Sequence, residues 1–128
     1  MKTKPQILIA LLIVICFAGC ATITGDPVLV NAEKTTAIAA DAIDTFLKIE
    51  YDNQVTIKQN APAIHQYANY VRKNAPQWLA SARALTKAYE TNRTSQGKFD
   101  LDTAIAVLTA AQVQSQIYIA KIAPTPTH

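Results

Sequence analysis

The chain has 128 residues, half of them hydrophobic, and its formal net charge at pH 7 is +3. This length suits one domain with a single core, and abundant alanine with only three glycines favours helices. Lys2 and Lys4 account for two of the surplus charges. The remainder is nearly neutral, so we expect no nucleic-acid partner.

The first twenty residues have the pattern of an export signal. Two lysines precede an apolar stretch from Ile7 to Ala18, and small residues precede Cys20. A positive start, a short apolar segment and a small-residue cleavage site are the parts of a secretory signal. We therefore expect residues 1–19 to be a signal peptide and residues 20–27 a tether.

The processing site, Phe17-Ala18-Gly19-Cys20, resembles the lipobox of bacterial lipoproteins, although leucine is commoner where Phe17 stands. The resemblance implies that a diacylglyceryl group is attached to the Cys20 sulfur, with fatty acids such as palmitate. It also implies that the signal is cut away and the new amino terminus acylated. In enteric bacteria an aspartate directly after this cysteine retains a lipoprotein in the inner membrane. Ala21 stands there, so the resemblance implies an outer-membrane anchor facing the periplasm.

Two other interpretations of this segment stay open. A transmembrane helix needs about 20 apolar residues, and the run from Ile7 to Ala21 is shorter. An ordinary secretory signal could use Ala18-Gly19 or Gly19-Cys20-Ala21 as its cleavage site. Cys16 would leave with the signal, and the mature chain would then have no disulfide.

The first helix of the mature chain is predicted from about residue 28 to Asn53. Asp26 and Pro27 have the pattern of a helix cap followed by proline at the first helical position. Apolar and small residues recur every three or four positions and predict a buried face: Val28, Ala32, Thr35, Ala39, Ala42, Ile43, Phe46 and Ile49. A polar interruption at residues 51–54 indicates a turn, although no glycine or proline fixes its place.

A heptad stripe follows, with alternating spacings of four and three: Ile57, Ala61, Ile64, Ala68, Val71, Ala75, Trp78, Ala82, Leu85 and Tyr89. Every seventh residue from Ala61 to Ala82 is alanine, which allows close approach of a neighbouring helix. The stripe keeps its phase across Pro62 and Pro76. We therefore expect Pro62 to begin the second helix and Pro76 to kink it.

Residues 91–97 are dense in turn formers and predict a loop. The last helix is expected to start at residues 98–100 and to end near Ile122. One predicted stripe contains Leu101, Ile105 and Leu108, and the other contains Ala104, Leu108, Ala111, Ser115, Tyr118 and Ile122. Between Thr103 and Ala120 there is no charged residue, which indicates a helix that is sandwiched between others or contacts a partner.

The sequence therefore predicts an all-α fold, an elongated antiparallel three-helix bundle over residues 28–123 with its middle helix kinked at Pro76. The count would be four if Pro76 splits that helix. Residues 124–128 are expected to be a flexible tail.

No residue pattern indicates catalysis, a metal or a cofactor, and we expect none of the three. His65 has Asn69 rather than a metal ligand four residues on, and His128 is distant. Ser81, His65 and an aspartate could be drawn as a triad, but no nucleophile-elbow glycines surround Ser81.

Two candidate interaction surfaces remain. The first is the uncharged last helix at Ala106 and Ala110. The second is an aromatic and basic patch next to the heptad stripe, formed by Tyr67, Tyr70, Arg72 and Lys73. Trp78 lies on the stripe and is expected to pack in the core rather than stack on a ligand.

Charge is unevenly divided, with an acidic excess in residues 28–54 and a basic excess in residues 55–98. Neighbouring acidic and basic helices would explain it, and the alternative is a basic surface facing anionic lipid or an acidic partner.

We expect a small, non-catalytic, lipid-anchored envelope protein that binds the membrane through Cys20. Its helical surface would contact another envelope protein or a second copy. The alternatives are a module that binds a lipid or small apolar ligand, a phage-derived lysis or exclusion lipoprotein, and an enzyme.

Overall fold

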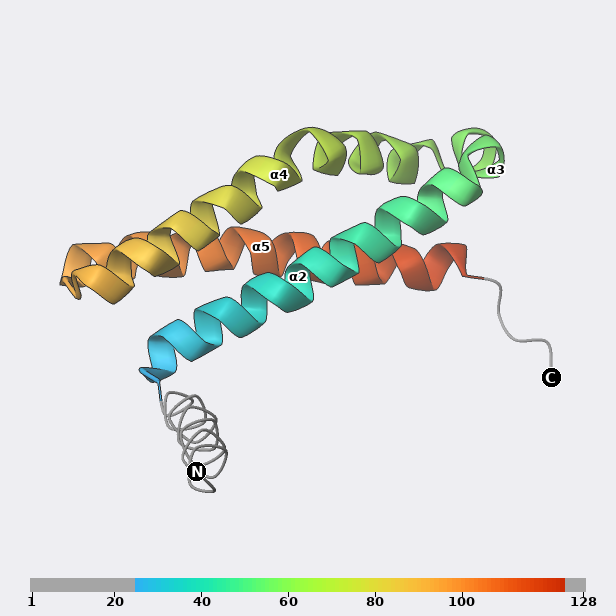
Figure 1. The fold of residues 1–128 in the computed structure, drawn as a ribbon. Helices are drawn as coiled ribbons and strands as arrows, with labels where there is room; N and C mark the ends of the chain where they lie inside the picture. The colour runs from blue at the N-terminus through green and yellow to red at the C-terminus, as the bar shows by residue number, and fades with distance from the viewer. Residues whose placement is uncertain (1–24, 124–128) are drawn as a thin grey trace, which may run out of the picture.

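The computed structural model describes residues 25–123, and every regular element in that range is a helix. The helices are α2 (Pro27–Asp52), α3 (Gln54–Asn60), α4 (Pro62–Thr91) and α5 (Ser95–Ile122). The three long helices pack lengthwise into an elongated body, each against the other two (Figure 1). The predicted all-helical class is confirmed. The expected signal peptide, most of the tether and the tail lie outside the described residues.

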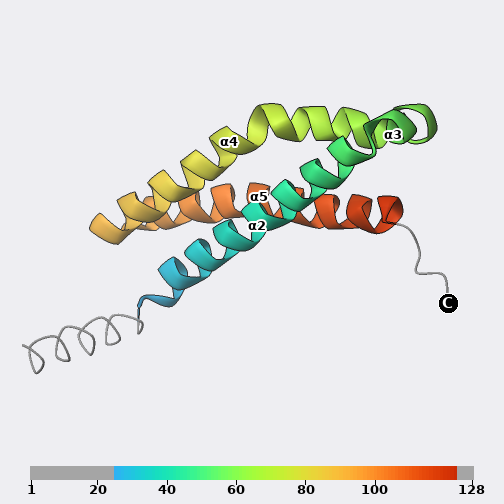
Figure 2. The same cartoon turned by 45° about the vertical axis from the view of Figure 1, so that its right-hand side comes forward.

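Helix α4 runs antiparallel to both α2 and α5, which are therefore parallel to each other. At one end, Ala32 of α2 packs with Tyr89 near the end of α4 and Leu101 near the start of α5. At the other end, Phe46 of α2 lies with its ring centroid 6.0 Å from that of Tyr118. Figure 2 shows the same arrangement from a second direction.

The predicted cap at the start of α2 is confirmed. Asp26 accepts a hydrogen bond from the backbone N–H of Val28 at 2.9 Å, and Pro27 is the first helical residue. The helix ends at Asp52, where the side-chain amide of Asn53 donates to the carbonyl of Ile49 at 2.8 Å. The predicted turn is therefore present.

Between residues 25 and 123 the chain forms four helices and not the predicted three, because the short helix α3 precedes α4. Proline has no N–H and its ring crowds the carbonyl four residues back, which favours a break in the helix before Pro62. Helix α3 accordingly ends at Asn60, and Pro62 begins α4 as predicted. The fourth helix arises here and not from a split at Pro76.

Helix α4 passes through Pro76 without interruption and bends partway along its length (Figures 1 and 2). A proline inside a helix removes one backbone hydrogen bond and causes such a kink. The predicted stripe is buried on both sides of the proline: Ile64, Ala68, Val71, Ala75, Ala82 and Tyr89. The packing of this stripe keeps both halves in one helix.

The predicted start of the last helix is wrong by several residues. Helix α5 begins at Ser95, and the hydroxyl of Thr94 caps it by accepting from the N–H of Gly97 at 3.0 Å. A Cβ added at Gly97 would lie 3.0 Å from that hydroxyl, so the glycine leaves room for the cap. Turn-forming residues in this stretch therefore start a helix, as serine and threonine also do at caps.

Small residues from neighbouring helices meet in the core. Ala39, Ala82 and Leu108, one from each long helix, form a cluster in which all three are fully buried. The predicted alanine positions of α4 thus contact neighbouring helices. On α5 the buried residues are Leu101, Leu108, Ala111 and Ser115, which follow the predicted stripes.

Candidate functional site

Helix α5 has one buried face and one exposed apolar face. The exposed face, called the outer face of α5 below, has no charged residue between Thr103 and Ala120, and the polar Thr109 and Gln116 are exposed beside it. It comprises Phe99, Thr103, Ala106, Val107, Ala110, Val113, Ile117 and Ala120. Its largest side chains are well exposed, with Phe99 at 66%, Val113 at 49% and Ile117 at 43%. The predicted residues Ala106 and Ala110 lie at its centre and are exposed.

The aromatic residues of the second predicted surface lie beside this face. Tyr70 is 54% exposed, and its ring centroid is 5.5 Å from that of Trp78. Tyr67 is partly buried, and its ring lies edge-on to Tyr118 at 5.2 Å. Burial raises the pKa of the Tyr67 hydroxyl, which therefore stays protonated at neutral pH. These rings form a continuous cluster along the side of α4 that meets α5.

The two predicted surfaces meet in a shallow groove. Its volume is about 280 Å³, and its walls are Tyr67, Tyr70, Trp78, Val107, Ala110 and Ala111. Ala110 belongs both to this groove and to the outer face of α5. The two surfaces were predicted as separate, because α4 and α5 are distant in the chain at these positions.

The basic half of the predicted patch is divided. Arg72 is directed to α2, where its guanidinium donates to the carboxylate of Glu50. Lys73, the next residue, is exposed and makes no ion pair with another described residue. The structure therefore groups Tyr67 and Tyr70 with α5 and assigns Arg72 to a contact between α2 and α4.

Glu50 is the residue that sequence analysis missed. Its side chain is fully buried, and the Nδ1 of His65 lies 2.6 Å from its Oε1. Asn69 completes a ring of hydrogen bonds, since its amide nitrogen lies 3.2 Å from His65 Nε2 and its oxygen accepts from Arg72 at 3.0 Å. Both ring nitrogens of His65 are thus engaged in the ring. The sequence does indicate that Glu50 is buried, because it stands four residues after Phe46 on the buried face of α2.

Opposing effects act on the pKa of Glu50. Burial by itself would raise it, but hydrogen bonds from His65 and Arg72 and the charge of Arg72 together hold it below the ordinary value of 4.5. The carboxylate is therefore charged at neutral pH, and it fastens α2 to α4 near the α3 end of the bundle.

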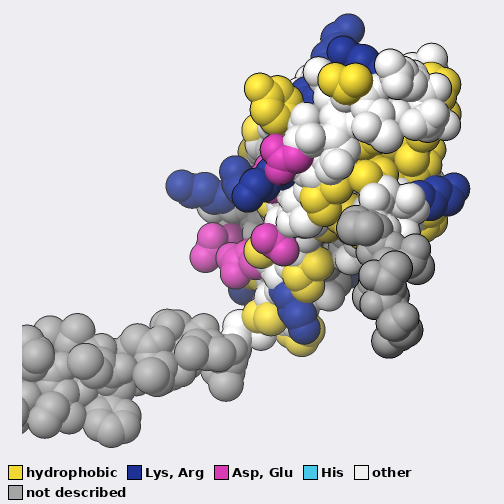
Figure 3. Space-filling view, turned by 90° about the vertical axis from the view of Figure 1, so that its right-hand side faces the viewer, with side chains coloured by type: hydrophobic (Ala, Val, Ile, Leu, Met, Phe, Trp, Pro, Cys, Tyr) yellow, Lys and Arg dark blue, Asp and Glu magenta, His cyan; other side chains and the backbone are white. Residues whose placement is uncertain are grey.

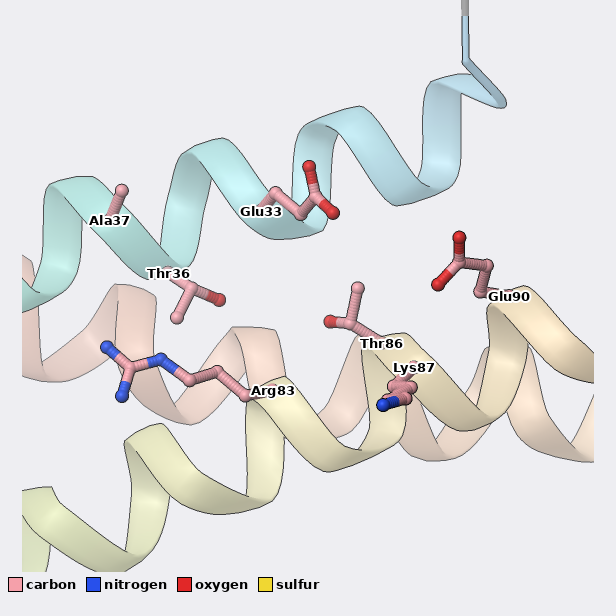
Figure 4. Close-up of a pocket in the computed structure, with 7 residues that line it drawn as sticks. All are labelled: Glu33, Thr36, Ala37, Arg83, Thr86, Lys87 and Glu90. Carbon is pink, nitrogen blue, oxygen red and sulfur yellow. The ribbon is translucent and has the colours of Figure 1, made fainter. Parts of the chain in front are cut away.

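A second, polar groove of about 470 Å³ lies between α2 and α4. Glu33 and Glu90 bring negative charge to it, and Arg83 and Lys87 bring positive charge (Figure 4). The hydroxyls of its two buried threonines donate to carbonyls within their own helices. Opposite charges balance in this groove, so it does not select a ligand by charge.

Acidic and basic helices do pack as neighbours, as the charge division predicted. Besides Glu50 with Arg72, Asp26 before α2 pairs with Arg93 after α4 at 3.3 Å. Figure 3, a view from the end at which α3 lies, shows acidic side chains gathered on one side beside basic ones. Part of the basic excess of residues 55–98 is thus paired with acidic residues of the same chain.

The described residues give no support to the triad drawn from sequence. Ser81 and His65 both belong to α4 and stand sixteen residues apart, or about 24 Å along a helix. His65 is also engaged by Glu50 and Asn69. Among residues 25–123, no three metal-binding side chains lie close enough together to hold an ion.

The described part of the chain is thus a small all-helical protein with an exposed apolar face on its last helix. Comparison with protein families, with characterised proteins and with solved structures found no match. None of the helices between residues 25 and 123 has the length and apolar character needed to span a bilayer.

The lowered pKa of Glu50 predicts an acid-sensitive fold. Because the folded-state pKa lies below the unfolded-state value, the carboxylate contributes its full stabilisation above pH 4.5 and loses it as the pH falls through the folded-state pKa. We expect Glu50→Gln to remove this part of the decline in the free energy of unfolding, measured by urea denaturation at several pH values. Asp52→Asn, an exposed change on the same helix, is the control. Identical pH profiles for Glu50→Gln and the native chain would contradict the assignment.

The different surroundings of Arg72 and Lys73 predict different effects of their removal. Arg72→Ala should lower the free energy of unfolding by about 2–4 kcal/mol, because the buried Glu50 keeps only His65 as a partner. Lys73→Ala should change it by about 0.5 kcal/mol or less, as expected of an exposed residue. Thermal or urea unfolding measures both, and equal effects would show that Arg72 does not hold Glu50.

Proposed function

We propose that this chain is a non-catalytic, lipid-anchored protein of the bacterial cell envelope. Its anchor is the acylated Cys20, and its site is the outer membrane on the periplasmic side. Its helical body presents the outer face of α5 to a protein partner in the envelope. The lipobox resemblance at residues 17–20 supports the anchor.

The observation that carries the proposed interaction is the exposure of the outer face of α5. Isolated exposed apolar residues are common on proteins, but a continuous apolar surface is typical of an interaction site. Here Val107, Val113 and Ile117 are each at least 40% exposed, with alanines between them and no charge. A helix with two apolar faces is suited to contact its own bundle with one and a partner with the other.

The aromatic groove beside this face favours a second candidate function, the binding of a small apolar ligand. Its volume of about 280 Å³ is near the lower limit of ligand pockets, which span about 300–1,000 Å³. A groove of this size also fits one side chain of a protein partner. Native mass spectrometry of the isolated protein tests for a retained ligand.

The anchor predicts a specific covalent change. When the full chain is produced in a bacterial host, mass analysis should find residues 20–128 with a diacylglyceryl group on Cys20, and labelled palmitate should be incorporated. Cys20→Ala should abolish both the label and the cleavage. Cys16→Ala is the matched control and should change neither. An unmodified thiol on Cys20 in a chain that retains residues 1–19 would contradict the anchor and the compartment together.

The interaction face predicts that a buried charge would prevent complex formation. We expect Ala106→Glu or Ala110→Glu to abolish the cross-linked complex recovered from intact cells, because a carboxylate would be desolvated in the interface. The free energy of unfolding should change by about 0.5 kcal/mol or less, since both positions are exposed. Ala84→Glu, an exposed alanine on α4, is the control. Complexes that survive both α5 substitutions would exclude this face.

A further inference from the structure

We propose that the side chain of Phe99, near the start of α5, inserts into the bilayer that holds the lipid anchor and makes a second contact with the membrane. This inference deepens the proposed function and rests on its anchor at Cys20. It is carried by the length of chain between Cys20 and Asp26, by the place where that chain enters the bundle, and by the exposure of Phe99.

The chain between the anchor and the bundle is short. Five residues separate Cys20 from Asp26, and a chain of this length spans at most about 20 Å. Helix α2, which begins at Pro27, is about 39 Å long. The anchor therefore holds the bundle by one of its ends, and the end that contains Asp26 is the one nearest the bilayer.

The start of α5 lies at this same end. Arg93, just before α5, pairs with Asp26 at 3.3 Å. Lys98 lines a groove together with Pro27, the first residue of α2. Figure 1 shows the start of α2 and the connection between α4 and α5 at the same end of the body. Phe99 directly follows Lys98, so it lies at the end of the bundle that the anchor brings to the bilayer.

Phe99 has the size and the exposure of a side chain that contacts a membrane. It is 66% exposed, whereas Phe46, the other phenylalanine between residues 25 and 123, is fully buried. Phenylalanine is among the residues that enter the boundary between lipid headgroups and acyl chains. Tyr51 and Val55 are exposed as well, but they lie at the α3 end of the bundle, remote from the anchor.

The charges around Phe99 fit zwitterionic headgroups. Arg93 and Lys98 are about half exposed and bring positive charge to this end of the bundle. Asp100 and Asp102 bring negative charge to the same turns of α5. Neither sign is in excess, so the contact rests on the apolar ring and does not require anionic lipid. Salt, which screens exposed charges, should therefore leave the contact intact.

The anchor makes a contact through one side chain sufficient. A single phenylalanine would hold a free protein on a membrane only weakly, but an anchored chain is already at the bilayer, and its effective concentration there is high. The contact would also orient the bundle. The outer face of α5 would begin at Phe99 on the bilayer and continue to Ile117, about 27 Å along the helix. Ala106 and Ala110 lie between these residues and remain available to the protein partner.

The test places a tryptophan reporter near either end of α5. Trp78 is the one tryptophan of the chain, so Trp78→Phe is combined with Phe99→Trp or with Ile117→Trp. Each full, acylated chain is reconstituted in phosphatidylcholine vesicles with or without bromine on the acyl chains, because bromine quenches tryptophan at short range.

Brominated lipid should lower the fluorescence of the Phe99→Trp variant by at least about twofold, because a ring inserted about 5–10 Å deep lies beside the acyl chains. The Ile117→Trp variant is the matched control, and its fluorescence should change by about 10% or less, since its reporter lies about 27 Å farther along α5. If Trp78→Phe unfolds the chain, Trp78 is kept and its own quenching, measured in the native chain, is subtracted.

The outcomes separate this contact from the proposed function. Mass analysis of the same samples establishes whether Cys20 is acylated, and without an acyl group the proposed anchor falls and this contact with it. If Cys20 is acylated and brominated lipid does not quench the Phe99→Trp variant, the bilayer contact is overturned and the proposed function stands. Equal quenching of both variants would overturn a contact confined to Phe99. It would place the whole outer face of α5 on the bilayer and so contradict its proposed protein partner.

Discussion

The close approach of three long helices at alanine positions is the constraint on which this fold depends. Ala39 and Ala82 are fully buried against Leu108, and neither side chain could be enlarged without separating the helices. The described residues contain no cysteine, so non-covalent contacts hold them together. Interdigitated packing of this kind also explains why α4 remains one helix despite Pro76, since a break would lose contacts on both sides of it.

Much of this fold could be predicted from sequence, because the buried faces of the helices appear there as apolar and small residues at regular spacings. The stripe from Ile57 to Tyr89 identified the buried faces of α3 and α4, and Asp26 with Pro27 identified the start of α2. The predicted helix boundaries are wrong where contacts between residues close in sequence determine them. Thr94 caps the start of α5 within a stretch rich in turn formers. Pro62 separates the short helix α3 from α4.

The candidate site was predicted less completely, for two physical reasons. The lack of charge in residues 103–120 identified an unusual helix, but only the packed structure distinguishes its buried face from its exposed one. Arg72 and Tyr70 are neighbours in sequence, yet a two-residue step turns a helix through about 200°, so they serve different contacts. The spacing after Phe46 places Glu50 on the buried face of α2, but the cation that pairs with it comes from another helix, and no local pattern identifies such a partner.

The two ends of the bundle are fastened differently. Glu50 is enclosed at the α3 end, whereas the pair of Asp26 with Arg93 at the opposite end lies near solvent, with Arg93 more than half exposed. The chain enters the bundle beside this second pair. A force applied through the segment before residue 25 would act first on the more exposed pair of Asp26 with Arg93. It would reach Glu50 only after α2 had begun to separate from the bundle. The pair of Asp26 with Arg93 would therefore take up such a load first, and the buried pair of Glu50 with Arg72 would take it up last.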